Sequence, residues 1–147
     1  MRRYYPYDEF LRDTKSLAAS LRNEKIDAIV AITRGGLTLA HMLAMSLDLR
    51  TIHTIRASSY EERDKRGNLA IDGAPNLRGA ANALVVDEIV DSGETMVTVL
   101  AALETANPRT AFKTAALFQK TTAIFRAHYF AHETDEWVDF FWEVDPF

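Results

Sequence analysis

One short segment of this chain holds most of the residues that could do chemistry. In the run ALVVDEIVDSGET, from Ala83 to Thr95, an apolar stretch leads into two adjacent acids, Asp87 and Glu88. Ligands bind to open α/β sheets at the carboxyl ends of the strands, which is where we expect these acids to lie. Adjacent carboxylates can accept both hydrogen bonds from the vicinal diol of a sugar, and they can also hold Mg²⁺.

The loop after the acids has the features of a phosphate site. Within Asp91–Thr95 the chain offers consecutive backbone N–H groups, two hydroxyls and a glycine at the expected start of a helix. Such a loop binds a phosphate monoester without a large cationic cluster. The structural alternative is a capped helix with Asp91 or Ser92 as N-cap, but capping would explain only one of the acids. A diol site beside a phosphate site indicates a phosphorylated ribose.

Other nucleotide-binding loops are absent from the sequence. Neither GxxxxGK[ST] nor GxGxxG occurs anywhere in the chain. Because these loops hold the phosphates of common nucleotide ligands, kinase-like and dehydrogenase functions are disfavoured.

The composition is that of an ordinary globular protein. The chain has 147 residues, of which 48% are hydrophobic and 26% charged, so we expect a single domain over residues 1–147. A formal charge of -4 argues against broad nucleic-acid binding. Zero cysteines exclude disulfides, thiolate metal sites and cysteine nucleophiles. Since no apolar run suggests a membrane span or a signal-peptide core, we expect a cytoplasmic location.

Apolar periodicity predicts alternating strands and helices that would position these loops. The unbroken apolar character of 82–86 suits a parallel sheet covered on both faces, and the alternating order favours an α/β fold. We expect helices over Tyr7–Glu24, Leu37–Met45 and Thr95–Thr105, and strands over Ile26–Ile32, Thr51–Ala57, Asn82–Val86 and Ala111–Phe118. The long segment Ser58–Ala80 is charged and has few apolar residues. Because loops of that length are often lids, we predict a lid here.

The segment Ala83–Thr95 resembles the phosphoribosyl pyrophosphate motif of the type I phosphoribosyltransferases. That motif is an apolar run, two acids, two apolar residues and then D-[ST]-G-x-T. Within that family the chain is most similar to the bacterial xanthine-guanine enzymes, because TRGGL, SSY, FQK and WVDFFWE follow in the same order. The resemblance implies a mainly parallel sheet flanked by helices, with a small hood and a long flexible loop over the site.

The activity that the resemblance implies is purine salvage. The 5-phosphoribosyl group would pass from phosphoribosyl pyrophosphate to a 6-oxopurine (guanine, xanthine or hypoxanthine), with Mg²⁺, giving a nucleoside monophosphate and pyrophosphate. A homodimer or homotetramer is also expected. Two alternatives stay open: a phosphoribosyltransferase for another base, and a non-catalytic regulator that binds nucleotides and RNA. The acidic charge argues against the regulator.

The resemblance also assigns a donor site. Phosphoribosyl pyrophosphate would be bound by Arg34, Gly35, Arg66, Asp87, Glu88, Asp91, Ser92, Gly93, Glu94 and Thr95. Arg34 and Gly35 would hold pyrophosphate, and the Thr33–Arg34 peptide bond would be cis. Arg66 would contact pyrophosphate from the long loop, with Arg63 and Lys65 as alternatives.

The purine and metal sites are implied in the same way. Lys120 would donate to the oxygen at C6, which adenine lacks, and Trp137 and Val138 would contact the ring. Asp91 would also contact the purine, as the general base acting at N7. Glu88 and Glu143 would bind the metal, each one carbon longer than the aspartate more common in the family. Phe140, Phe141 and Trp142 are expected in the core or at a subunit interface, and no site role is expected for His41, His53, His128 and His132.

Overall fold

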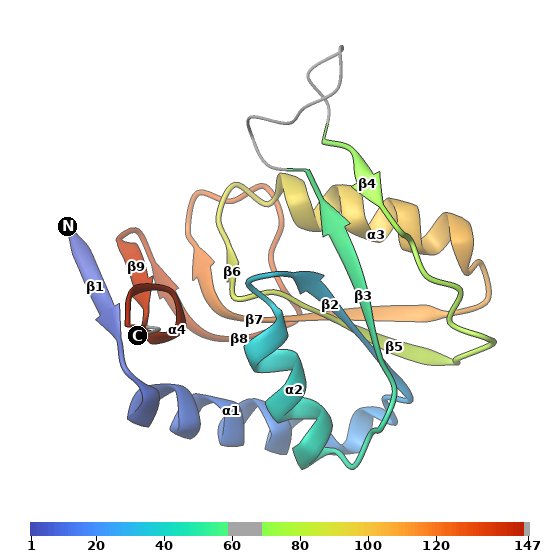
Figure 1. The fold of residues 1–147 in the computed structure, drawn as a ribbon, viewed down its shortest axis with the longest axis horizontal. Coiled ribbons are helices and arrows are strands. Elements are labelled where there is room, and N and C mark those ends of the chain that lie inside the picture. Colours follow the sequence, from blue (N-terminus) through green and yellow to red (C-terminus); the bar gives the residue numbers. More distant parts are fainter. Residues whose placement is uncertain (59–68, 146–147) are drawn as a thin grey trace.

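A mostly parallel sheet forms the centre of the molecule (Figure 1). The computed structural model describes residues 1–58 and 69–145. In spatial order the sheet consists of β4 (Ile71–Asp72), β3 (Ile52–Ala57), β2 (Ala28–Thr33), β5 (Asn82–Val86), β7 (Ala111–Lys120) and β8 (Tyr129–Thr134). The short β6 (Ile89–Val90) pairs with β7 in line with β5. All these pairs are parallel except β3 with β4. The predicted α/β fold is therefore confirmed.

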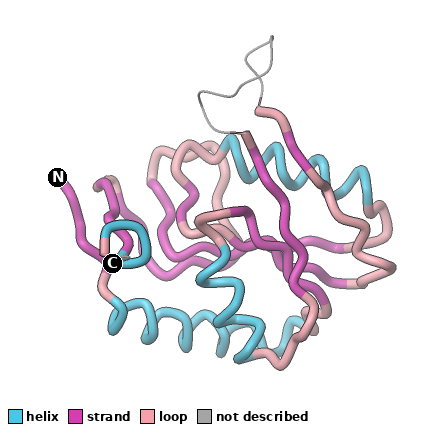
Figure 2. Tube along the Cα trace, in the orientation of Figure 1, coloured by secondary structure: helices cyan, strands magenta, loops and turns pink. Residues whose placement is uncertain are grey.

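Helices cover both faces of the sheet (Figure 2). One face carries α1 (Tyr7–Leu21), which continues into the short η1 (Arg22–Glu24), together with α2 (Leu37–Ser46); the other carries α3 (Glu94–Ala106). Successive side chains of a strand point to opposite faces, so in β2 Ile29 packs with α1 and α2 while Val30 packs with α3. Each predicted helix and strand is present within a few residues of its expected bounds.

The two ends of the chain form a small hood beside the main sheet. β1 (Arg2–Tyr5) pairs in parallel with β9 (Trp137–Phe140), and α4 (Phe141–Val144) follows. Tyr5 is fully buried, and its ring meets those of Phe118 and Phe140 edge-on at centroid distances of 5.0 and 5.7 Å. Aromatic packing therefore fixes the hood on β7.

Asp87 and Glu88 interrupt a strand that then resumes. β5 and β6 keep a common register against β7. Between them, the N–H of Asp87 donates to the carbonyl of Ala115 at 3.1 Å, and the N–H groups of Leu117 and Phe118 donate to the carbonyl of Glu88 at 3.0 and 3.2 Å. The two acids thus lie directly after the end of β5, as predicted, in the gap before β6, and the neighbouring strand holds their backbone.

Part of the predicted long loop is ordered structure. β4 pairs with the end of β3, and the carbonyl of Ala70 accepts the N–H of Ser58 while the hydroxyl of Ser58 accepts the N–H of Ala70, both at 2.8 Å. The prediction of a lid falls mainly on residues 59–68, which lie outside the described residues, as do Arg63, Lys65 and Arg66. Within the described ranges, the helices are all too short or too polar to cross a membrane.

Candidate functional site

Three adjoining cavities open at the carboxyl ends of the central strands. The first, of about 230 Å³, lies at the loop between β6 and α3; the second, of about 870 Å³, at the loop between β2 and α2; and the third, of about 150 Å³, between β7 and the hood. Asp87 lines the first and second, Glu88 the second and third, and Asp91 the first and third. The cavities are therefore parts of one site.

The predicted site residues that the structure describes all line these cavities. Segments far apart in the sequence supply them: the loop after β2, the loop after β6, the end of β7 and the hood. They are Arg34, Gly35, Asp87, Glu88, Asp91, Ser92, Gly93, Glu94, Thr95, Lys120, Trp137, Val138 and Glu143.

The loop after β2 is held close to the broken strand. The Thr33–Arg34 peptide bond is cis, as the resemblance implied. A Cβ placed on Gly35 would lie 2.3 Å from Oε1 of Glu88, and one on Gly36 would lie 2.3 Å from the backbone oxygen of Val86. Gly36 needs glycine because backbone atoms of the two segments approach too closely for a side chain, whereas a Cβ on Gly35 would meet only the side chain of Glu88.

The loop before α3 has the geometry of an anion site. Gly93 has a φ of +89°, and a Cβ on it would lie 2.7 Å from the backbone nitrogen of Phe125, so two constraints require glycine. The hydroxyl of Ser92 accepts the N–H of Glu94 at 3.2 Å, and the carbonyl of Ser92 accepts the N–H of Ile124 at 2.8 Å. The first N–H groups of a helix have no partner within it, so those that follow Glu94 at the start of α3 can bind an anion in the first cavity.

Glu94 is the charged residue between Gly93 and Thr95. The sequence predicts that its side chain turns outward, because its carboxylate would repel a phosphate. The residue lines the first cavity and is only partly exposed. Its backbone N–H is already bonded to Ser92.

Three carboxylates share a partly buried space at the centre of the site. Burial raises the pKa of Asp87 to about 7, and the charge of Glu143 adds to this while the N–H of Glu88, 2.8 Å from Oδ1, opposes it. Burial and the charges of Asp87 and Glu143 raise the pKa of Glu88 to about 8. Because part of this rise is mutual repulsion, a divalent cation among the three acids would relieve it.

The third cavity combines an ion pair with an apolar wall. Nζ of Lys120 lies 3.8 Å from Oδ1 of Asp91, with side-chain exposures of 16% and 68%. Val138 and Phe140 are buried, whereas Trp137 is 57% exposed, with the guanidinium of Arg2 5.8 Å from its ring centroid. Its indole N–H donates to Asp139 at 3.2 Å, which orients the ring. A flat heterocycle would fit this combination of a ring and a cation.

Among the lining residues that sequence reasoning missed, Trp142 bonds directly to one of the acids. We had expected it in the core or at an interface, but it lines the second cavity and its Nε1–H donates to Oε2 of Glu88 at 3.3 Å. Its place in the chain next to Glu143 was the available signal. Phe140 is buried as expected, and it also lines the third cavity.

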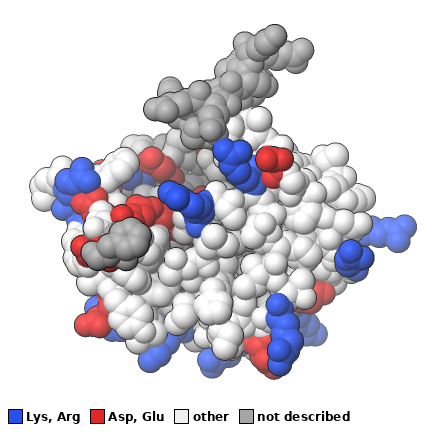
Figure 3. Space-filling view, viewed as in Figure 1, with Lys and Arg blue, Asp and Glu red and all other residues white. Residues whose placement is uncertain are grey.

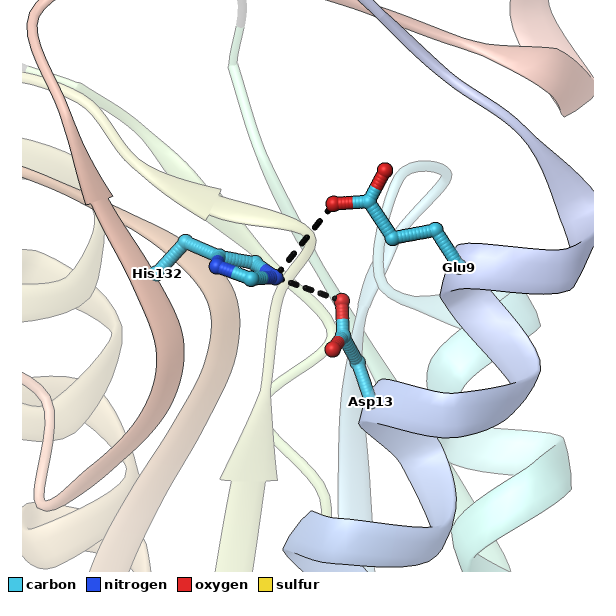
Figure 4. Close-up of side chains that lie close together, drawn as sticks. All are labelled: Glu9, Asp13 and His132. Carbon is cyan, nitrogen blue, oxygen red and sulfur yellow. Dashed lines mark hydrogen bonds and ion pairs between the residues drawn. The ribbon is translucent and has the colours of Figure 1, made fainter.

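A second group of possible metal ligands lies outside the three cavities (Figure 4). Nε2 of His132, on β8, lies 2.8 Å from Oδ2 of Asp13 and 3.5 Å from Oε1 of Glu9, both on α1. Arg3 already pairs with Glu9, and the hydroxyl of Tyr5 donates to Asp13 at 2.6 Å. Since each carboxylate has other partners, we interpret this group as an ion-pair cluster that joins α1, β1 and β8.

Comparisons with known proteins agree on a single family. The family model described as "Phosphoribosyl transferase domain" matches residues 3–147. The chain is 30% identical over 145 residues to a xanthine-guanine phosphoribosyltransferase of Cereibacter sphaeroides, covering 94% of this chain and 84% of that protein. It is 37% identical over 89 residues to the Chromohalobacter salexigens protein of the same name, covering 60% of this chain and only 54% of the relative. The solved Helicobacter pylori xanthine-guanine-hypoxanthine phosphoribosyltransferase superposes with a TM-score of 0.89 at 38% identity, covering 99% of this chain and 96% of that one.

Proposed function

Because the chain belongs to the phosphoribosyltransferase family and has its type I fold, we propose that it is a purine salvage enzyme. It transfers the 5-phosphoribosyl group of phosphoribosyl pyrophosphate to guanine, xanthine or hypoxanthine, and releases the nucleoside monophosphate and pyrophosphate. The observation that carries this proposal is the continuity of the site: the Lys120–Asp91 pair borders an aromatic cavity on one side and the anion loop on the other.

The first two cavities would hold the donor. The amides and hydroxyls of Asp91–Thr95 bind its 5-phosphate at the amino terminus of α3. Asp87 and Glu88 accept hydrogen bonds from the ribose diol. Arg34, exposed beside the second cavity, pairs with the pyrophosphate. We assign Arg66 the same partner, by resemblance alone.

The third cavity would hold the base. Free guanine with its proton on N7 presents the O6 acceptor and the N7–H donor next to each other on one edge. Lys120 donates to O6, and Asp91, which the sheet places beside it, takes the proton carried at N7. Adenine carries an amino group at C6, which cannot accept the bond from Lys120. Trp137 and Val138 contact the ring and its edge.

The reaction replaces one bond at the anomeric carbon with another. The bond from that carbon to pyrophosphate breaks as N9 of the purine attacks, and the proton at N7 passes to Asp91. A general base in this position contributes a rate factor of about 10² to 10⁴. Arg34 neutralises charge that develops on the leaving pyrophosphate.

The acids around Glu88 fit a magnesium ion. Asp87, Glu88 and Glu143 offer oxygen ligands, and burial together with the charges of their neighbours raises the pKa values of the first two. We propose that Glu88 and Glu143 hold the ion. When bound, Mg²⁺ would supply positive charge to the diphosphate of the donor.

A face of the molecule fits contact with a second copy of the chain. α2 carries no charged residue, yet Leu37 is 41% and Met45 70% exposed. Figure 3 shows that charged side chains are sparse over α2 on this face. An uncharged helix with exposed apolar side chains fits a covered surface, so we propose a homodimer or homotetramer in which a second copy covers α2. The cysteine-free sequence supports a cytoplasmic location.

Pyrophosphate release tests the proposed function. The purified protein, with Mg²⁺ and phosphoribosyl pyrophosphate, should release pyrophosphate when guanine, xanthine or hypoxanthine is added, and the three bases need not be used equally. Adenine and uracil, tested in parallel, should support little release. Release with adenine or uracil alone, or with no base at all, would contradict the proposal.

A further inference from the structure

The indole of Trp142, in the hood, contacts Glu88 at the centre of the site. Trp142 belongs to α4, in the last turn of the described chain, and Glu88 lies in the break between β5 and β6. Nε1–H of Trp142 donates to Oε2 of Glu88 at 3.3 Å. Trp142 therefore connects the hood to one of the acids that the proposed function assigns to the ribose.

Packing determines the direction of that indole N–H. The ring of Trp142 stacks on Phe140 at a centroid distance of 4.8 Å and an interplanar angle of 21°. Phe10 and Phe141 meet it edge-on at 5.3 and 5.0 Å, and Tyr5 at 6.3 Å. Since rings hold the indole on several sides, its N–H points to Glu88 irrespective of what that carboxylate does.

Glu88 is the side chain that needs such a partner. It carries one methylene more than the aspartate common in the family at this position, so it has an additional torsion to fix. Oε1 lies against Gly35, where an added Cβ would come within 2.3 Å, and Oε2 meets Trp142. The carboxylate is thus confined between a glycine that leaves room for it and an indole that bonds it.

We propose that Trp142 is a positioning residue for Glu88. Its N–H compensates for the longer glutamate arm and holds the carboxylate where the ribose diol of the donor binds. This inference rests on the proposed function, because it concerns how the same site holds its donor. Trp142 itself need not touch the substrate.

Trp142→Phe tests the proposal because it keeps an aromatic ring and removes the N–H donor. We expect the KM for phosphoribosyl pyrophosphate to rise about fivefold or more, while kcat and the KM for guanine change less than about twofold. In a Glu88→Asp background the shorter arm cannot reach the indole, so adding Trp142→Phe should raise the donor KM less than about twofold. Phe141→Leu is the matched control, since it disturbs the same aromatic cluster without removing the N–H.

Fluorescence gives a second readout that does not depend on turnover. The chain has two tryptophans, so Trp137→Phe leaves Trp142 as the only one. Its emission should change when the donor binds, and much less so when Glu88→Asp is also present.

The outcomes separate the two proposals. If the wild-type protein releases no pyrophosphate with any base, the proposed function fails. If the wild type is active but Trp142→Phe matches it in donor KM, or if Phe141→Leu raises that KM equally, the positioning role is overturned.

Discussion

Lys120 and Asp91 lie side by side because of the register of two strands. Val90 of β6 pairs with Gln119 of β7, so the next residue of each strand faces the other, and Nζ of Lys120 lies 3.8 Å from Oδ1 of Asp91. The sheet backbone thus sets the spacing between a cation and a carboxylate. In the proposed function that spacing matches two adjacent atoms on the edge of a 6-oxopurine.

Replacing Lys120 by Ala should damage the use of guanine selectively. A hydrogen bond to a charged group is worth about 1.5 to 3 kcal/mol, so kcat/KM for guanine should fall about 10- to 100-fold, while the weak reaction with adenine should not fall. Steady-state kinetics with both bases measures this. Arg126→Ala removes an exposed cation paired with Glu133 and should leave both values unchanged. Equal losses for guanine and adenine would argue against base selection by Lys120.

Replacing Asp91 by Asn should reduce turnover more than binding. The amide keeps the size of the side chain but cannot accept a proton as a carboxylate does, so kcat should fall about 10² to 10⁴-fold. The KM for phosphoribosyl pyrophosphate should change much less. Unchanged turnover would remove the assignment of Asp91 as the general base.

The two glycines after β2 should respond differently to alanine. On Gly36 the added Cβ would meet the backbone oxygens of Val86 and Ile32 at 2.3 and 2.8 Å, and we expect Gly36→Ala to cost about 1 to 3 kcal/mol in free energy of unfolding. On Gly35 it would meet only the carboxylate of Glu88, which can move. Gly35→Ala should therefore unfold near the wild-type temperature but have a raised donor KM. Thermal denaturation and steady-state kinetics on both variants test this contrast. An equal loss of stability in Gly35→Ala and Gly36→Ala would contradict it.

The stability of the ligand-free protein should depend on pH through the acids of the site. Burial and neighbouring charge raise the pKa of Asp87 to about 7 and that of Glu88 to about 8. At pH values between the ordinary pKa of each acid and its raised pKa, the folded chain holds more protons than the unfolded chain. The free energy of unfolding therefore falls as the pH rises through this range. This contribution is full below about pH 4 and lost by about pH 8.

Thermal denaturation between pH 5 and pH 8.5, without Mg²⁺, measures this dependence. The Tm should fall by several degrees across the range, and Glu88→Gln should make the fall shallower. Glu104→Gln, which replaces an exposed acid on α3, should leave the slope unchanged. A Tm profile with the same slope in Glu88→Gln as in the wild type would refute this account of the acids.

A charge on α2 should break the proposed subunit contact. Met45 is 70% exposed on a helix without charges, so Met45→Glu would bury a carboxylate in the interface. Sedimentation velocity should show a dimer or tetramer for the wild type and a smaller species for this variant. Ala101→Glu adds the same charge to the exposed side of α3 and should leave the assembly intact. A monomeric wild type, or an assembly that survives Met45→Glu, would contradict the contact.

The elements whose residues carry a local pattern could be predicted from the sequence. The strand Asn82–Val86 has the expected bounds, since its apolar run is unbroken and is buried on both sides of the sheet. The acids and the small-residue loop then lie at the carboxyl end of the sheet, because they follow this strand directly in the chain. The cis bond at Thr33–Arg34 was inferred from resemblance, not from any local pattern.

The features that the sequence did not reveal depend on contacts between distant residues. β1 and β9 pair the two ends of the chain, and each is too short to show a periodic pattern. β6 could not be predicted, because Asp87 and Glu88 interrupt the apolar run and leave only two residues for the strand after them. His132 meets Asp13 only after β8 packs beside α1, and the indole of Trp142 is directed by rings from three segments.

A crystal structure of the protein with bound GMP tests the central claim most directly. We expect its phosphate at the amides of 92–96, its ribose hydroxyls at Asp87 and Glu88, and its guanine between Lys120 and Trp137. A nucleotide bound elsewhere on the molecule, with these three cavities empty, would contradict the account.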